Sequence, residues 1–338
     1  MKKKRINIFS KIACIILMII LIFDSKNAIE GAKDGIILCI YTVLPTLFPF
    51  CVLSIIFRSM TSNRSLSVFR TIEHLCGMPD GCGTIFLLGL MGGYPIGAIC
   101  IEDAVKEGCL KSQDAKYLRA VCNNAGPSFI IGMMSGIFQQ KIAAFILIII
   151  QALSALLTCM LICDQSDKKI RILTHKNITL TAAIKQACNS MSGVCGIIII
   201  FRTFINVVNK HLSSLILTEI WVPFVGILEL TNGVSMLSHL TNREYMFILA
   251  AGMISFGGIC VAIQTITISA PDTGKHYIIC KACQGIIAIL LSYVYIKTGV
   301  LFVLLYFMLF MFIRIIILES KNKYKITKNS RNSDLNTV

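Results

Sequence analysis

The chain has 338 residues, of which 56% are hydrophobic and only 14% are charged. Soluble globular domains carry about 25% charged residues, so this composition excludes a soluble protein and predicts an integral, multi-pass membrane protein. The net charge of +15 would suggest nucleic acid as a partner of a soluble chain, but here the basic residues fall in loops and tails. Membrane orientation and anionic headgroups account for them, and no nucleic-acid partner is expected.

Long apolar runs predict the membrane-spanning helices. Each is close to or above the ~20 residues that a helix needs to cross a bilayer. The first run follows a basic N-terminus, but it is too long for a signal peptide and lacks a small-residue cleavage site, so we predict a retained helix with its N-terminus in the cytoplasm. The runs occupy 8–23, 35–57, 142–163, 194–208, 246–270, 277–296 and 299–318.

Two apolar segments between residues 84 and 138 are interrupted in the middle. The first is broken at Gly92-Gly93-Tyr94-Pro95-Ile96-Gly97 and the second at Asn123-Asn124-Ala125-Gly126-Pro127. A backbone cannot leave N–H and C=O groups unpaired in hydrocarbon, so such breaks occur only where they are buried in protein or line a polar cavity. Interrupted helices of this kind indicate a transporter's substrate site.

The distribution of basic residues predicts that segment 84–101 is a re-entrant hairpin. If every apolar segment crossed the membrane, the loop 164–190 would lie outside, although it carries several Lys and Arg residues. Basic loops are typically cytoplasmic. A hairpin that turns at the Gly-Gly-Tyr-Pro break places 102–119, 164–190 and the C-terminal tail on the cytoplasmic side.

The second half of the chain is predicted to be an inverted repeat of the first. Segment 183–201 can be laid over 32–57, and 250–262 over 88–100, with a further break at 229–233. Inverted repeats are typical of alternating-access carriers. The predicted organisation is an N-terminal helix, two repeats, a final helix and a disordered basic tail, at 1–30, 31–181, 182–298, 299–318 and 319–338.

Two of the charged residues in the second half are candidate site residues, Arg202 and Glu229. A charge at the centre of a membrane costs ~2.5–3.5 kcal/mol or more, so Arg202 either faces a cavity, where it can bind a carboxylate, or extends to the interface. Glu229 lies at the second-half break. It either binds a coupling cation, carries a proton or neutralises Arg202, or it caps a helix end.

The polar residues at the breaks complete the candidate site. Asn side chains there can replace lost helical partners or coordinate a ligand, and the helix that resumes at Pro127 directs its positive N-terminal end toward the break, which suits an anion. No cofactor and no enzymatic motif is expected, and the coupling ion, Na⁺ or H⁺, stays open. The candidate substrate-binding residues are Gly92, Gly93, Tyr94, Asn123, Asn124, Ser128, Arg202, Glu229, Thr231, Asn232 and Gln264.

Four motifs carry a family resemblance. LPTLFPF (44–50), GGYPIGA (92–98), NNAGPSFIIG (123–132) and ELTNG (229–233) resemble, in this order, the YlbJ-type sporulation integral membrane proteins, also called stage V sporulation protein V. That family belongs to the nucleoside-recognition, or Gate, domain group, which is similar to the core of concentrative nucleoside transporters. The resemblance implies an all-α membrane fold with inverted repeats, interrupted helices and re-entrant hairpins. The second half lacks a proline in SFGGICV, so unequal contributions of the halves are expected.

The resemblance also implies a role in endospore formation, as a carrier of dipicolinic acid from the mother-cell cytoplasm across the outer forespore membrane. Dipicolinate carries two carboxylates on a planar ring, which suits Arg202, helix N-termini and asparagines. One alternative is a cation-coupled transporter of nucleosides or other organic anions, with Glu229 and Asn123 binding the ion. Another is a non-transporting membrane scaffold for the spore envelope. The expected partners are the small anion and the bilayer, and a homo-oligomer stays open.

Overall fold

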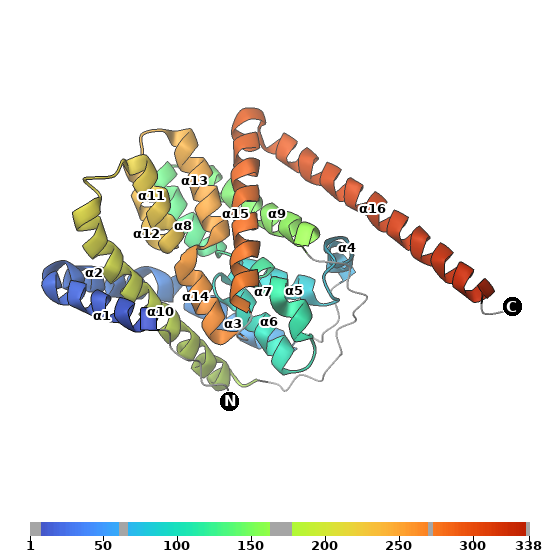
Figure 1. Cartoon of the computed structure of the whole chain (residues 1–338), viewed down its shortest axis with the longest axis horizontal. Coiled ribbons are helices and arrows are strands. Elements are labelled where there is room, and N and C mark those ends of the chain that lie inside the picture. The colour runs from blue at the N-terminus through green and yellow to red at the C-terminus, as the bar shows by residue number, and fades with distance from the viewer. Residues whose placement is uncertain (1–7, 61–66, 163–177, 270–272, 336–338) are drawn as a thin grey trace.

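The computed structural model describes residues 8–60, 67–162, 178–269 and 273–335, and every regular element within them is a helix (Figure 1). In this part of the chain, six helices are long and apolar enough to cross a membrane. The prediction of an all-α, multi-pass membrane protein is therefore confirmed. The six candidate spans are Ser25–Phe57, Lys141–Ile162, Leu180–Leu212, Arg243–Ile268, Gly274–Thr298 and Val300–Ile317. The basic N-terminus and most of the predicted cytoplasmic loop 164–190 lie outside the described residues.

The first predicted span is a helix, but a short one. α1 (Ile8–Phe23) has 16 residues, equivalent to about 24 Å at 1.5 Å per residue, which is less than a ~30 Å hydrocarbon core. It meets α2 (Ser25–Leu38) at Asp24, and α2 packs along α10 (Leu180–Leu212). The crossing that was expected to begin at residue 35 thus begins at Ser25, within the same helix.

The next helix contains Pro45 and Pro49 and has a π-helical turn just before them, but it is not interrupted. We expected a kink or break at Pro45 and Pro49, because each removes a backbone donor from the helix. Instead, a π-helical turn, η1 (Cys39–Val43), joins α2 to α3 (Leu44–Met60) in one continuous span. The Thr46 hydroxyl donates to the carbonyl oxygens of Thr42 and Val43, at 2.6 and 3.2 Å. A side chain thereby supplies a donor next to the proline.

The two halves of the chain contain the same sequence of elements: a long helix, a hairpin of two short helices, an interrupted helix and another long helix. After α2–α3 and the short α4 (Ser67–Cys76), the first half contains α5 (Cys82–Gly92), α6 (Ile96–Lys106), α7 (Ser112–Val121), α8 (Pro127–Phe138) and α9 (Lys141–Ile162). After α10, the second half contains α11 (Thr218–Leu228), α12 (Leu230–Met236), η2 (Leu237–His239), α13 (Arg243–Phe256), α14 (Gly258–Ile268) and α15 (Thr273–Thr298).

The order of elements pairs the segments differently from one predicted correspondence. Segment 88–100 was laid over 250–262, but the hairpin α5–α6 corresponds in order to α11–α12, and the break between α13 and α14 corresponds to the break between α7 and α8. Both regions contain a Gly-Gly pair, but the structure around the two pairs differs. In the first pair a proline follows and the chain reverses, whereas α13 and α14 together form one candidate span.

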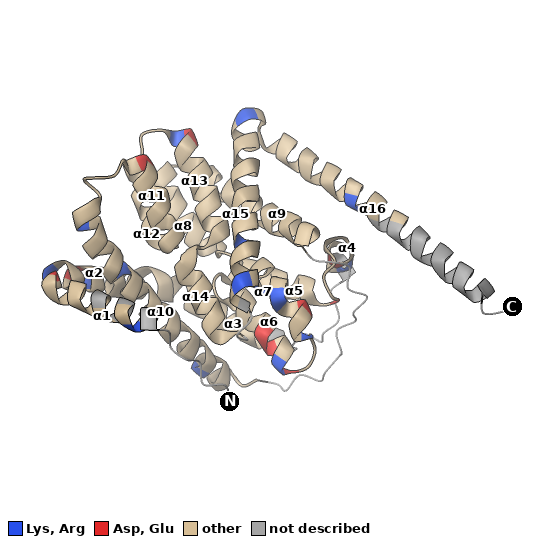
Figure 2. Cartoon of the chain, viewed as in Figure 1, with Lys and Arg blue, Asp and Glu red and all other residues tan. Residues whose placement is uncertain are grey.

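The last helix continues through most of the segment that was predicted to be a disordered tail. Gly299, with φ +87°, separates α15 from α16 (Val300–Leu335), which extends away from the bundle (Figure 1). Residues 300–335 contain no glycine or proline that would end a helix. The tail is therefore helical to Leu335. In Figure 2, charged residues lie mainly at helix ends and in connections, although α15 carries basic residues along its length.

Candidate functional site

The first hairpin turns at the predicted Gly-Gly-Tyr-Pro break. Gly93 ends α5 with φ +79°, a left-handed conformation that glycine adopts freely, and α6 begins three residues later. The reversal brings Gly89 and Gly97 together, and both pack directly against the carbonyl oxygen of Cys122. The side of the hairpin that carries Gly89 and Gly97 therefore packs against the break between α7 and α8.

Amide side chains and close backbone approach characterise that second break. The backbone of Gly126 packs against Gly93, and both Asn123 and Asn124 are fully buried. Asn124 Nδ2 donates to the carbonyl of Val121 at 2.7 Å, while Gln151 Nε2 from α9 donates to the carbonyl of Ala125 at 3.1 Å. These side chains replace helical partners that the break removes, as one of the two interpretations of the asparagines predicted.

The second hairpin turns at Glu229. Gly226 of α11 and Gly233 of α12 pack against each other, so the chain reverses between them. The Glu229 carboxylate caps α12: Oε1 accepts from the Thr231 amide at 3.0 Å and from its hydroxyl at 2.5 Å, and Oε2 accepts from the Asn232 amide at 2.7 Å. Glu229 is 2% exposed, so the capping alternative describes its contacts.

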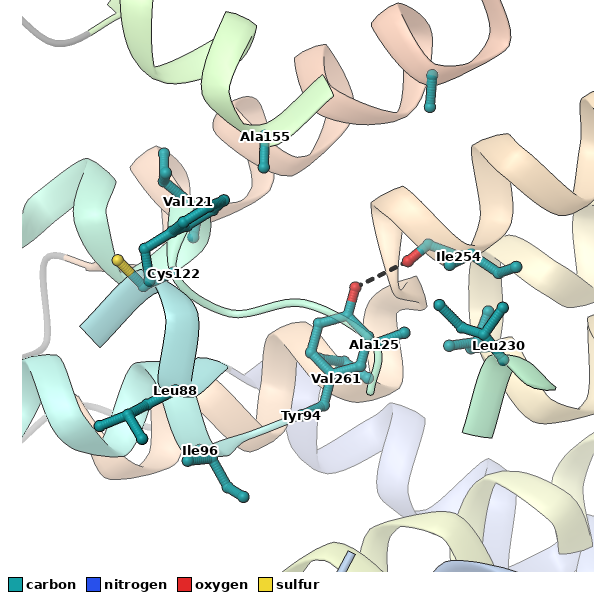
Figure 3. Close-up of a cluster of buried hydrophobic side chains, with 14 of the residues drawn as sticks. Leu88, Tyr94, Ile96, Val121, Cys122, Ala125, Ala155, Leu230, Ile254 and Val261 are labelled. Carbon is teal, nitrogen blue, oxygen red and sulfur yellow. Dashed lines mark hydrogen bonds between the residues drawn. The ribbon is translucent and has the colours of Figure 1, made fainter. Parts of the chain in front are cut away.

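Tyr94 connects the first half to the break between α13 and α14. Gly257 and Gly258 both have φ +84°, and a Cβ at Gly257 would lie 2.7 Å from the Tyr94 hydroxyl oxygen. The hydroxyl donates to the carbonyl of Ile254 at 3.0 Å, in the last turn of α13, where carbonyls lack helical partners (Figure 3). Gly258 in turn lies against the amide of Leu230. All four breaks therefore meet at one place.

A small cavity lies at this meeting point. Its volume is about 50 Å³, which is room for a few water molecules. Four of the predicted site residues line it, one from the first hairpin and three from the second half: Tyr94, Glu229, Thr231 and Gln264. The remaining lining is apolar or backbone, from both halves of the chain: Val43, Leu47, Ala125, Gly126, Phe129, Val194, Ile198, Leu230, Cys260 and Val261.

A second polar cluster lies on the other side of Tyr94. Asn123 Nδ2 donates to Thr265 Oγ1 at 3.0 Å and to Tyr277 Oη at 2.9 Å. Asn124 Oδ1 accepts from Gln284 Nε2 at 2.8 Å and from Lys281 Nζ at 3.4 Å. These partners on α14 and α15 were not predicted. A lysine and a glutamine three residues apart within the apolar run 277–296 are the signal that could have identified two of them.

Several buried polar atoms near the breaks have no hydrogen-bond partner among the described residues. Buried polar groups are normally paired, so such a group of atoms indicates bound water or ligand. The residues that the structure describes contain no group of three or more His, Cys, Asp or Glu side chains placed to bind a metal ion. The unpaired atoms are Asn123 Oδ1, Gln151 Oε1, Asn232 Nδ2, Ser255 Oγ and Gln264 Oε1.

Some predicted site residues lie elsewhere. Arg202 is half-buried and does not line the cavity: it is one helical turn beyond Ile198, and its Cβ packs against Gly35 of α2. Ser128 Oγ faces α3, with the Thr46 carbonyl at 3.5 Å. Gly92 packs against Ile96 within the hairpin. The direction in which Arg202 faces depends on the packing of α10 on α2, which the sequence does not display.

One known protein is similar to the chain over most of its length. The sporulation integral membrane protein YlbJ of Bacillus subtilis (strain 168) is 22% identical over an alignment 314 residues long, and the match covers 78% of this chain and 76% of that protein. The resemblance to YlbJ is confirmed. No family model matches the chain, and no solved structure matches it. The aligned region is long enough to include all four helix breaks, so the similarity to YlbJ extends over the place where they meet.

Proposed function

We propose that the chain is a carrier that moves dipicolinate from the mother-cell cytoplasm across the outer forespore membrane by alternating access. The observation that supports this most is the meeting of four helix breaks around a small cavity in a chain with six candidate spans. Unpaired backbone at membrane depth is tolerated where it lines a cavity, and it is how carriers build substrate sites. Similarity to a sporulation membrane protein supplies the cellular setting.

In this proposal the two halves, 31–181 and 182–298, are inverted repeats that rock around the site, with both termini in the cytoplasm. The shared order of hairpin and interrupted helix in each half supports it. The cavity of about 50 Å³ is much smaller than the ~300 Å³ or more of typical ligand pockets, so the hairpins must move apart to admit a substrate. In the present arrangement the cavity is too small to hold a dicarboxylate.

The site suits an anion at the N-terminus of α8. This helix begins at Pro127, beside the cavity-lining Gly126, and no side chain caps it. Uncapped N-terminal amides carry a partial positive charge and bind carboxylates. By contrast, α12 already has the Glu229 carboxylate at its N-terminus. An incoming carboxylate would therefore be directed toward α8.

Cation-coupled transport of a nucleoside or another organic anion is the second candidate. Two carbonyl oxygens at the α7–α8 break, Asn123 Oδ1 and Gln151 Oε1, are buried without a partner among the described residues, and such oxygens are ligands for Na⁺. A non-transporting scaffold is disfavoured, because it would gain nothing from buried backbone breaks.

The test is the dipicolinate content of mother-cell and forespore fractions in a strain that lacks this chain. Dipicolinate retained in the mother cell, with spores depleted of it, would support the proposal, and normal spore dipicolinate would overturn it. Complementation should fail with Asn124→Ala and succeed with Gly136→Ala, because nothing lies within 4 Å of a Cβ at Gly136. A scaffold would tolerate both variants as long as the protein still accumulates in the membrane, which an immunoblot of each strain measures. Uptake that requires Na⁺ would favour the coupled alternative.

A further inference from the structure

We infer that Lys281 is the specificity-determining residue of this site: its ammonium group pairs with a carboxylate of an anionic substrate. This inference rests on the proposed carrier function and adds the residue that selects for charge. It follows from the buried environment of Lys281, from its contact with the ring of Tyr94, and from the neighbouring amide donor of Gln284.

Lys281 is a buried lysine whose hydrogen-bond partners are uncharged. The residue is 1% exposed and lies within the candidate span that α15 forms. Its Nζ donates to Gln284 Oε1 at 2.8 Å and, more weakly, to Asn124 Oδ1 at 3.4 Å. Among the residues that the structure describes, no carboxylate forms an ion pair with it, unlike Arg119 and Lys297. Two of its three N–H donors thus have an acceptor.

Such an arrangement is unfavourable for a purely structural residue. An ammonium group removed from water without a counter-charge loses several kcal/mol of solvation, and buried charges are normally paired. A methionine of similar length would fill the same space without that penalty. Ionisable residues inside membrane segments are accordingly found on substrate pathways. A negatively charged ligand would supply both the missing charge and the missing acceptor.

The ring of Tyr94 lies between Lys281 and the cavity. Nζ is 5.3 Å from the centroid of the ring, a cation–π distance, while Tyr94 also lines the cavity that Lys281 does not reach. The ring faces of tyrosine attract cations, so the ring partly compensates the ammonium while no substrate is bound. Tyr94 is therefore a side chain that contacts both the cavity and Lys281.

The neighbours of Lys281 suit a carboxylate. Gln284 Nε2 is a donor that currently serves Asn124 Oδ1 at 2.8 Å, next to the ammonium. A carboxylate that replaced the Asn124 oxygen would accept from both Lys281 and Gln284, which are three residues apart on one face of α15. Charge-assisted hydrogen bonds of this kind are about twice as strong as neutral ones. A neutral solute would leave the ammonium without a counter-charge.

The experiment uses the full-length chain in liposomes and compares Lys281→Met and Lys281→Arg with the wild type. The readouts are uptake of labelled dipicolinate and the shift in unfolding temperature caused by dipicolinate, by phthalate and by the neutral pyridine-2,6-dicarboxamide. We expect Lys281→Met to reduce dipicolinate uptake at least about tenfold, equivalent to about 1.4 kcal/mol, and to abolish the shifts caused by the two dicarboxylates. Lys281→Arg keeps the charge and should retain more uptake than Lys281→Met.

Lys297→Met is the matched control. Lys297 is on the same helix and lies 5.9 Å from the centroid of the Tyr293 ring, but it is exposed and paired with Glu244 at 3.3 Å. This control should leave uptake unchanged. Without ligand, Lys281→Met should unfold at the same temperature as the wild type or higher, because an unpaired buried charge is removed. A structural role would instead lower that temperature.

The outcomes separate this inference from the proposed function. If the wild type takes up dipicolinate and Lys281→Met does so equally well, the inference is overturned while the carrier stands. If the wild type ignores dipicolinate but phthalate stabilises it through Lys281, the dipicolinate proposal is overturned and the inference stands. The inference would be overturned if no dicarboxylate stabilised the wild type. It would also be overturned if Lys281→Met lost the shift caused by the neutral diamide as completely as the shifts caused by the dicarboxylates.

Discussion

Gly97 packs directly against the carbonyl oxygen of Cys122, which leaves no room for a side chain at position 97. The partner is backbone, so it cannot rotate away as a flexible side chain would. We expect Gly97→Ala to lower the free energy of unfolding in detergent by about 1–3 kcal/mol, the usual effect of overpacking, and to reduce transport. Gly136→Ala, on exposed surface of α8, should be neutral or stabilising by up to about 1 kcal/mol. Equal effects of the two substitutions would contradict the packing described here.

Glu102 and Arg119 form a buried ion pair that joins α6 to α7. Both Nε and Nη2 of Arg119 lie 2.9 Å from Glu102 Oε2, and the arginine is 1% exposed. Arg119→Met leaves a buried carboxylate without its partner, so we expect a loss of about 3–5 kcal/mol. The double variant Glu102→Leu/Arg119→Met should lose less than Arg119→Met alone.

The exposed pair of Lys297 and Glu244, at 3.3 Å, is the comparison for that experiment. Breaking it with Lys297→Met should change the free energy of unfolding by no more than about 1 kcal/mol. Denaturant unfolding of the wild type and the three variants provides the measurement. If the double variant were less stable than Arg119→Met, the loss in Arg119→Met could not be due to the unpaired Glu102 carboxylate.

Glu229 should affect stability through the cap of α12. Glu229→Ala removes the acceptor for the Thr231 and Asn232 amides, and loss of such a cap costs about 0.5–2 kcal/mol. Glu229→Gln retains one carbonyl oxygen and should cost less than the alanine variant. The exposed Glu219→Ala, in the first turn of α11, is the control, with thermal unfolding as the readout. If Glu229→Gln keeps its stability but loses uptake, the carboxylate itself takes part in transport.

Tyr94→Phe tests the hydrogen bond that joins the two halves. The variant keeps the ring between Lys281 and the cavity but leaves the Ile254 carbonyl without its donor. We expect a loss of about 1 kcal/mol, typical of one neutral hydrogen bond, in thermal unfolding of the purified chain. Tyr245→Phe provides a control, because the hydroxyl of Tyr245 donates to the Glu219 carbonyl at an exposed position. A larger effect at Tyr245 would show that the bond between halves contributes little.

The sequence predicted the breaks because their chemistry is local. Glycine permits unusual backbone angles and proline fixes φ and removes an N–H donor, each at its own position in the chain. Gly93 and Asn124 could therefore be identified without tertiary structure. Arg202 could not be placed, since both faces of α10 are apolar enough to pack and only contact with α2 decides which way it points. Lys281 was not predicted, because its burial beside Tyr94 and Asn124 depends on how α15 packs against the first half of the chain.

The predicted tail shows the opposite limitation. Its polar composition suggested disorder, yet α16 continues to Leu335, because no glycine or proline between 300 and 335 interrupts a helix that the membrane segment has already nucleated. The polar composition of the tail indicates that it lies in water. It does not indicate where the helix ends, which here depends on the absence of glycine and proline.

The π-helical turn at Cys39–Val43 sets the rotational phase between α2 and α3. Upstream of it, Gly31 and Gly35 face α10, and at its end Val43 and then Leu47 face the cavity. One residue of an α-helix corresponds to about 100° of rotation, so deleting a single residue from 39–43 would turn one of these faces away from its partner. The helix would keep nearly all of its length and hydrophobicity and still cross a membrane. It could no longer support α10 and the cavity at the same time.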